Sequence, residues 1–218
     1  MKPSKFIKEY PVVHGTDRDC EVPTLLEFIR AHTPVASLLD VGAHYTNVHY
    51  AKELRTMVKV YHGVDINDDP NTRLIVDQFF IGNACNIAFS MKYDMVTCVS
   101  TIEHAGISTY KADYRSERMR LFARLLELSN RWVWISFPVG TECFCPDQFA
   151  NITESDLTEF ETLCKTRGYG YRERFFYTEG AQMRHPWHEH ANRKEAVSVP
   201  HVVSLGAQSI CAMEIEKI

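Results

Sequence analysis

The sequence predicts a single α/β domain with a doubly wound, mostly parallel sheet and helices on both of its faces. Short apolar runs alternate with amphipathic stretches along most of the 218 residues, which is the pattern of successive strand–helix units. No low-complexity tract, internal repeat or Gly-, Ser- or Pro-rich linker interrupts that alternation. Apolar residues make up 45% of the chain and charged residues 24%, which are ordinary values for a globular protein that buries its own core.

Five strand–helix units are expected in the first two thirds of the chain. The first helix fits residues 23–31, because Pro23 is tolerated in the first turn of a helix and apolar residues follow on one side. Strands are expected at 37–41, 58–64, within 74–81, at 93–100 and at 132–137, with helices at 48–56 and 116–129.

The last third of the chain predicts one more helix and a pair of strands. Thr153 followed by Asp156 is a helix start signal and Gly168 is a stop, so the helix should cover residues 154–167. Strands are expected at 171–177 and 208–215. The polar, His-rich segment between them is long enough to be a functional loop.

Charge and composition exclude several classes of protein. The net charge of −4 argues against a general nucleic-acid or anionic-membrane binder. No signal peptide is expected at the N-terminus, and the longest apolar stretch, residues 132–140, is far shorter than the ~20 residues that span a bilayer. Seven scattered cysteines without a CxxC pair are typical of a reducing compartment, so a cytoplasmic protein is expected. The oligomeric state stays open.

Glycine and polar residues stand where four of the expected strands end. The carboxyl ends of parallel strands meet at one edge of a sheet, so we expect one ligand site there. Glycine lets the backbone approach a ligand closely, and an acid after the next strand is placed to accept hydrogen bonds from a ribose. An amide after the third strand could read an adenine edge. The expected ligand-binding residues are Asp40, Gly42, Ala43, His44, Asp65, Ile66, Asn83, Ala84 and Ser100.

These segments together resemble the class I S-adenosylmethionine-dependent methyltransferases. LLDVGAHYT (38–46) stands at that family's first-strand motif, VDI (64–66) at its ribose-binding acid and GNA (82–84) where GDA is common. YDMVTCVSTIEH (93–104) and WVWISFPVG (132–140) resemble its fourth and fifth strands. The resemblance implies a seven-stranded sheet with an antiparallel last strand, and S-adenosylmethionine as the cofactor. One departure is that the family's G-x-G-x-G loop keeps only Gly42, with His44 and Thr46 in the other two places.

The resemblance also implies a division of the chain and a kind of acceptor. Residues 1–36 would form an N-terminal helical cap, 37–140 the cofactor-binding core, and 141–218 the C-terminal helix and strand pair with the His-rich loop. The segments 175–196 and 206–217 resemble the tail of small methyltransferases from bacterial polysaccharide and natural-product gene clusters. The implied acceptor is an oxygen or nitrogen of a sugar or secondary-metabolite intermediate.

Two groups of residues are candidates for work on the acceptor. His104 could take a proton as the methyl group arrives, with Glu103 orienting it; alternatively the pair only closes the cofactor pocket. Tyr110, Trp187 and His188 are candidates for contacting the acceptor. The run from His185 to His190 also resembles part of the metal site of the small-RNA 2′-O-methyltransferases. That family has a further Glu where Ser100 stands here, so no metal is assigned.

Three other functions compete with a small-molecule methyltransferase. An RNA-directed methyltransferase is opposed by the acidic balance, and no nucleic-acid or membrane partner is expected. A catalytically silent relative of the fold draws support only from the altered glycine loop. A nicotinamide-dependent dehydrogenase is discounted, because GAHYT lacks the glycines that seat a pyrophosphate on a helix N-terminus.

Overall fold

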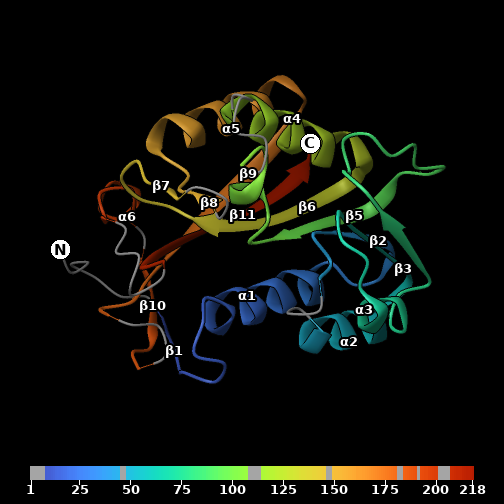
Figure 1. The fold of residues 1–218 in the computed structure, drawn as a ribbon, viewed down its shortest axis with the longest axis horizontal. Coiled ribbons are helices and arrows are strands. Elements are labelled where there is room, and N and C mark those ends of the chain that lie inside the picture. Colours follow the sequence, from blue (N-terminus) through green and yellow to red (C-terminus); the bar gives the residue numbers. More distant parts are fainter. Residues whose placement is uncertain are drawn as a thin grey trace.

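The computed structural model describes residues 8–44, 48–107, 114–145, 149–180, 184–190, 192–200 and 207–218. Its centre is one sheet with helices packed on both faces, so the predicted α/β class is confirmed (Figure 1). Strands lie side by side in the order β1-β10-β9-β11-β6-β5-β2-β3-β4. Their bounds are β1 Lys8–Tyr10, β2 Val35–Val41, β3 Val58–Asp65, β4 Gln78–Ile81, β5 Tyr93–Val99, β6 Ser129–Pro138, β9 Tyr169–Tyr177, β10 Trp187–His190 and β11 Ser209–Lys217.

Five neighbouring strands of this sheet are parallel. They pair in the order β4, β3, β2, β5 and β6. The sequence analysis expected a strand at each of these positions. β11 then runs antiparallel to both of its neighbours, β6 and β9. Because the chain reverses order at β2, the carboxyl ends of β2, β3, β4 and β5 gather at one edge of the sheet, where the crossovers leave room for a ligand.

Within the described residues the sheet has nine strands rather than the expected seven, and the His-rich segment is not simply a loop. Its residues Trp187–His190 form β10, which pairs antiparallel with β9 on one side and with β1 on the other. Trp187 and Glu189 are buried on one face of this strand. His190, on the other face, is buried as well, so three of the four side chains of this strand are buried, although the charge and the histidines of the segment suggested a solvated loop.

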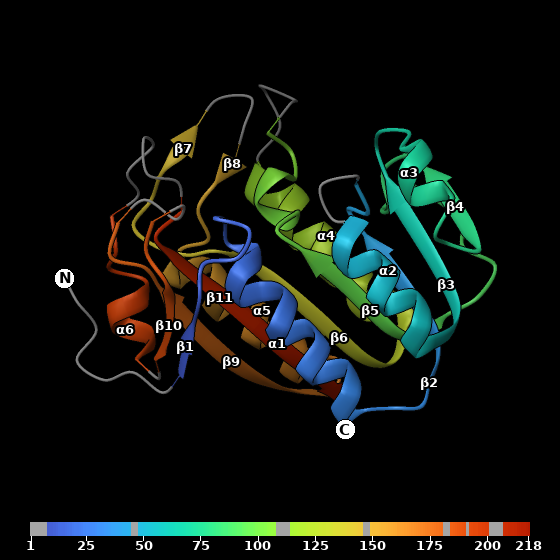
Figure 2. The ribbon, with the colours of Figure 1, turned by 90° about the horizontal axis from the view of Figure 1, so that it is seen from below.

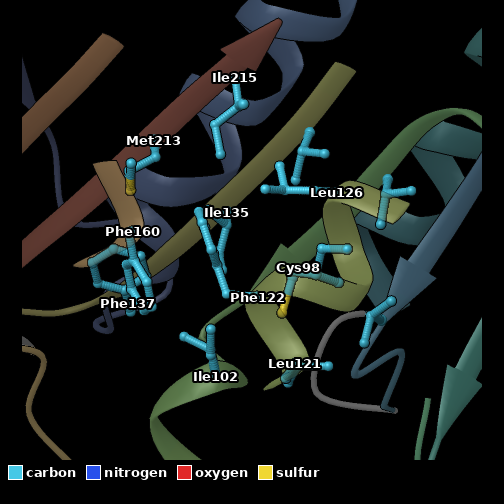
Figure 3. Packing of buried hydrophobic residues seen from close by; sticks show 14 of the residues in the cluster. Cys98, Ile102, Leu121, Phe122, Leu126, Ile135, Phe137, Phe160, Met213 and Ile215 are labelled. Atoms are coloured by element: carbon cyan, nitrogen blue, oxygen red, sulfur yellow. The ribbon is translucent and has the colours of Figure 1, made fainter. Parts of the chain in front are cut away.

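Helices cover the two faces of the sheet in separate layers (Figures 1 and 2). α1 (Arg18–Ala31) and α2 (Val48–Met57) pack on one face, where Leu25, Ile29 and Leu54 meet Trp134. α4 (Tyr114–Leu128) and α5 (Glu154–Thr166) pack on the other. Figure 3 shows the core under α4 and α5, where the Phe122 and Phe160 rings stack at 4.2 Å.

The two helices with the clearest sequence signals differ in how well their starts were predicted. α5 begins with the expected capping box, in which the Thr153 hydroxyl and the Asp156 carboxylate bond each other's backbone amides. α1 begins at Arg18, five residues before the predicted start, and Pro23 lies inside it. The Asp19 carboxylate accepts bonds from three amides of the preceding loop, which fixes where that loop ends.

The short connections around β4 complete the frame of the site. α3 (Pro70–Arg73) is a single turn capped by Asp69, and no helix is described between β4 and β5. The expected strand–helix unit at this position is therefore a strand followed by turns. The strands β7 (Phe144–Cys145) and β8 (Phe149–Ala150) pair antiparallel, and β8 contacts the 3₁₀ turn Ile102–His104, whereas the single turn α6 (Arg193–Ala196) contacts β9. In the described part of the chain no helix is long and apolar enough to cross a membrane.

Candidate functional site

A cavity of about 450 Å³ opens at the carboxyl ends of β2, β3, β4 and β5. Its size falls within the range of ~300–1,000 Å³ that small-molecule sites occupy. Most of the sequence-predicted residues line it. They are Gly42, His44, Asp65, Ile66, Asn83, Ala84, Ser100 and His104.

Gly42 makes the turn at the end of β2 and brings the backbone against the neighbouring strand end. Its φ is +81°, a left-handed conformation that glycine adopts without strain. Its N–H donates to the Val64 carbonyl oxygen at 2.8 Å. A Cβ atom on this residue would lie 2.0 Å from Oγ1 of Thr101, so no side chain fits here. The Thr101 side chain, which also lines the cavity, therefore packs directly against the Gly42 backbone.

Two polar side chains at the next strand ends are held by local hydrogen bonds. Oδ1 of Asp65, at the end of β3, accepts a bond of 2.8 Å from the Asn67 N–H. Oδ1 of Asn83, just after β4, accepts one of 2.9 Å from the Cys85 N–H. Each side chain is thus oriented by an amide two residues further on, as in an Asx turn. Asp65 and Asn83 both line the cavity with this orientation fixed.

Asp40 and Ala43 lie under the cavity rather than in its wall. Asp40 is 1% exposed, and its carboxylate accepts bonds from the hydroxyls of Thr97 (2.8 Å), Tyr50 and Tyr61 (both 3.2 Å). Burial raises the pKa of Asp40 to about 6, against the lowering effect of those three bonds. Ala43 is buried beside Gly63. Asp40 therefore ties β2 to α2, β3 and β5.

The N-terminal turn of α1 reaches the same cavity, which the sequence analysis did not foresee. Arg18 lines the cavity and pairs with Glu21 one turn later. Glu21 is fully buried and accepts a bond of 2.6 Å from the Ser100 hydroxyl at the end of β5. With α1 predicted to start at Pro23, both residues fell in an expected loop. The acidic first turn of the helix was the one sequence signal that could have indicated them.

Glu103 and His104 follow Ser100 in a 3₁₀ turn, Ile102–His104 (η2). The His104 side chain is 53% exposed and lines the cavity, whereas Glu103 is buried, with its Oε1 3.8 Å from Nε2 of His104. Oε2 of Glu103 has no hydrogen-bond partner among the residues that the structure describes. Burial, with a further contribution from the Glu21 and Asp17 carboxylates, raises the pKa of Glu103 to about 8. The turn places an imidazole at the cavity and, next to it, a buried carboxyl whose raised pKa favours its uncharged form at neutral pH.

The remaining candidates for acceptor contact do not line this cavity. Trp187 is fully buried in β10, and its Nε1–H donates to the Thr16 carbonyl oxygen at 3.1 Å. His188 lies on the same strand, with Nδ1 3.6 Å from Oε2 of Glu9. Tyr110 lies outside the described residues. Within the described ranges, no group of three or more His, Cys, Asp or Glu side chains is arranged to hold a metal ion.

Comparison with known proteins identifies the fold and no closer relationship. No family model matches the sequence. No curated protein matches it either. Among solved structures, the chain is similar to magnesium protoporphyrin IX methyltransferase from Synechocystis PCC 6803 with bound S-adenosylmethionine, with a TM-score of 0.56 and 14% identity. That match covers 90% of this chain and 78% of that protein.

Two further solved structures agree. The N-methyltransferase NodS from Bradyrhizobium japonicum WM9 matches with a TM-score of 0.57 and 9% identity, over 90% of this chain and 94% of NodS. The 1,6-didemethyltoxoflavin-N1-methyltransferase from Burkholderia thailandensis, with its substrate and S-adenosylhomocysteine bound, matches with a TM-score of 0.58 and 10% identity, over 91% and 79% of the two chains. The chain therefore has the fold of the class I S-adenosylmethionine-dependent methyltransferases.

Proposed function

We propose that this protein is an S-adenosylmethionine-dependent methyltransferase that acts on an oxygen or nitrogen of a small-molecule acceptor. The observation that carries the proposal is the cavity at the carboxyl ends of β2–β5, lined by Gly42, Asp65 and Asn83 in a fold shared with cofactor-bound methyltransferases. We treat residues 1–218 as one methyltransferase-like domain, because both of its apolar cores pack on a single sheet.

The residues of the cavity fit the cofactor. The Asp65 carboxylate, oriented by the Asn67 N–H, would accept hydrogen bonds from the ribose hydroxyls. Ile66 beside it is 67% exposed and would offer an apolar contact. Asn83 would meet the adenine edge, since its amide is fixed near the end of β4. The amino-acid part of the cofactor would lie near Gly42, where the turn after β2 packs closely against Thr101. The sulfonium of S-adenosylmethionine supplies an electrophilic methyl group when the cofactor is bound.

His104 and Glu103 would handle the proton that the acceptor loses. The exposed imidazole of His104 lines the cavity and would accept the acceptor's proton at a ring nitrogen. The Glu103 carboxyl, whose Oε1 lies 3.8 Å from Nε2 of His104, would help to orient the ring. Methyl transfer depends mainly on the alignment of donor and acceptor, so we assign positioning to the cavity walls and only a supporting role to this pair.

The acceptor is proposed from similarity and charge. The compared N-methyltransferases include one crystallised with its small-molecule substrate, and the chain's own tail resembles small methyltransferases of sugar and natural-product gene clusters. The net charge of −4 does not favour an RNA acceptor. We leave Trp187 and His188 out of the proposed site, because one is core and the other pairs across an edge strand.

Calorimetric titration tests the cofactor. We expect S-adenosylmethionine and S-adenosylhomocysteine to bind the wild-type protein with micromolar affinity and NAD not to bind. Asp65→Asn should weaken both sulfur ligands by about 10- to 100-fold, the usual loss when a carboxylate that accepts ligand hydrogen bonds is neutralised. A thermal melt with saturating ligand provides an independent check, because ligand at a hundredfold over its dissociation constant adds ~2.7 kcal/mol of stability.

A matched variant separates the site from general charge effects. Asp68→Asn removes another acid three residues away, which is exposed and pairs with Arg73, and it should leave both affinities unchanged. Absence of binding by wild-type protein at millimolar ligand would contradict the proposal. Tight binding with no methyl transfer to any of a panel of hydroxyl and amine acceptors would instead favour the catalytically silent relative.

A further inference from the structure

The start of α1, which lies across the sheet (Figure 2), also contributes to the cavity through Arg18. Among the described residues that line the cavity, Arg18 is the one Lys or Arg. Its side chain is 18% exposed, so the guanidinium is partly withdrawn from solvent. A fixed cation in a small cavity is a strong recognition group for a carboxylate, since the planar guanidinium matches carboxylate geometry.

Glu21 holds that guanidinium in place. Its Oε2 pairs with Nη1 of Arg18, and its Oε1 accepts the 2.6 Å bond from the Ser100 hydroxyl, so both carboxylate oxygens are used. A fully buried carboxylate is retained only where such partners compensate its desolvation. Burial alone would lower the pKa of Arg18, but the Glu21 and Asp17 carboxylates raise it above its usual value. The guanidinium therefore stays charged.

Ser100 is the third member of this chain of contacts and lies at the end of β5. Its φ is +40°, which is an unfavourable conformation for a residue with a side chain. Its hydroxyl bonds Glu21, and its N–H donates to the Ser136 carbonyl oxygen at 3.1 Å. Glu103 and His104 follow directly in η2. The position of α1 is thus joined to the strand end that precedes the proposed acceptor-side residues.

We propose that Arg18 binds the carboxylate of the cofactor's amino-acid part, and that Glu21 is the positioning residue that fixes Arg18 and joins it to Ser100. This inference rests on the proposed function and deepens it. In the sequence, His44 and Thr46 stand after β2 where the family that the chain resembles has glycine, so the amino-acid part would gain from a contact outside that loop. The Arg18 guanidinium, at the start of α1, supplies such a contact.

The charges around Arg18 are consistent with an amino-acid ligand rather than a simple anion. Asp17 lies 3.5 Å from Nη1 of Arg18, so the first turn of α1 presents an acid and a base together. The amino-acid part of S-adenosylmethionine is a zwitterion, with an ammonium next to its carboxylate. A cluster of mixed sign suits such a ligand, whereas a phosphate or sulfate would be repelled by Asp17 and Glu21.

Two matched ligands test the assignment. S-adenosylhomocysteine carries the amino acid, and 5′-methylthioadenosine has the same thioether and nucleoside without it. We expect Arg18→Ala to weaken S-adenosylhomocysteine by about 10- to 100-fold, the loss of one charge-assisted pair, and to change 5′-methylthioadenosine less than twofold. Arg30→Ala, on the exposed side of the same helix, should change neither affinity. An equal loss for both ligands in Arg18→Ala would overturn the assignment.

Glu21→Gln tests the positioning role. The amide keeps the size of the side chain but weakens the hold on Arg18, so we expect a smaller selective loss for S-adenosylhomocysteine, with KM for S-adenosylmethionine raised more than kcat is lowered. In an Arg18→Ala background the same substitution should add no further selectivity, because nothing is left to position. A loss that persists in that background would overturn the role of Glu21. Wild-type protein that binds neither ligand would instead refute the proposed function.

Discussion

The cavity has two walls that are built in different ways. The strand-end wall contains Gly42, Asp65 and Asn83, and the helix wall contains Arg18 at the start of α1. In the strand-end wall, Asp65 and Asn83 are each fixed by an amide two residues away. In the helix wall, Glu21 is fixed by Ser100, which is 79 residues distant in the sequence. The strand-end wall is therefore made by local turns, and the helix wall exists only once α1 has packed across the sheet (Figure 2).

This difference indicates which part of the site depends on global folding. A local turn keeps its geometry when distant elements shift, whereas a bond between α1 and the end of β5 reports the position of the whole helix. We expect substitutions in the strand-end wall to affect the ligand directly. Substitutions in the helix wall should also change how the ends of α1 and β5 are held relative to each other.

The largest effect should come from Gly42→Ala in the strand-end wall. The added Cβ would lie 2.0 Å from Oγ1 and 2.7 Å from Cβ of Thr101, and alanine would be strained at a φ of +81°. We expect a loss of about 3 kcal/mol in the free energy of unfolding, from strain and overpacking together. Binding of S-adenosylhomocysteine should also become undetectable in calorimetry, because Thr101 must move within the cavity wall.

Gly168→Ala is the matched control for the conformational part of this effect. Gly168 has a φ of +74°, and a Cβ there would meet no atom within 4 Å. Urea unfolding should show a loss of about 1 kcal/mol, from backbone strain alone, with ligand affinity unchanged. If both variants lost the same stability and both still bound ligand, the close approach at Gly42 would have no importance for the site.

A smaller effect is expected at Glu103, which lies behind the cavity between the two walls. Its pKa is about 8 in the folded protein, above the ~4.3 of an unfolded chain, so the folded state binds the extra proton between these values. The protonated Glu103 carboxyl therefore contributes fully to the free energy of unfolding below pH ~4.3, and this contribution is lost as the pH rises through 8. Glu103→Gln should therefore gain stability relative to wild type as the pH rises, by about 2 kcal/mol between pH 5 and pH 6.5.

Urea unfolding at a series of pH values measures this difference. Glu159→Gln, on the exposed face of α5, should follow the wild-type curve at every pH. A Glu103→Gln curve parallel to wild type from pH 5 to 9 would mean that Glu103 is ionised in the folded protein at neutral pH. Its proposed role behind His104 would then be that of a permanent charge.

Sequence reasoning could place the residues of the strand-end wall at one cavity because their signals are local. An apolar run that ends in Gly or Asp marks a strand end, and parallel strands bring such ends together, so Gly42, Asp65 and Asn83 could be predicted to share one site. Asp40 has the same signal, yet its carboxylate turns inward to three hydroxyls supplied by α2, β3 and β5. Its direction depends on tertiary partners that no local pattern reveals.

The helix wall and the far sheet edge could not be predicted for the same reason. Pro23 is a usual first-turn residue, but α1 begins earlier because Asp19 binds the loop before it, and this shift brought Arg18 and Glu21 into a helix. The His-rich segment has charged and polar residues typical of a loop. It becomes the strand β10 only because β9 and β1 supply hydrogen bonds on both sides, and because Arg174 pairs with the buried Glu189.

The smallest effect is expected outside both walls, at Trp187. Trp187→Phe keeps an aromatic ring in the core but removes the 3.1 Å bond to the Thr16 carbonyl oxygen, so unfolding should become easier by about 1–2 kcal/mol. The affinity for S-adenosylhomocysteine and the KM for an acceptor should not change. Phe175→Leu, in the core on the other face, is the control for a general loss of packing. A tenfold rise in acceptor KM for Trp187→Phe, but not for Phe175→Leu, would mean that the His-rich segment contacts the acceptor. It would contradict the proposal that Trp187 lies outside the site.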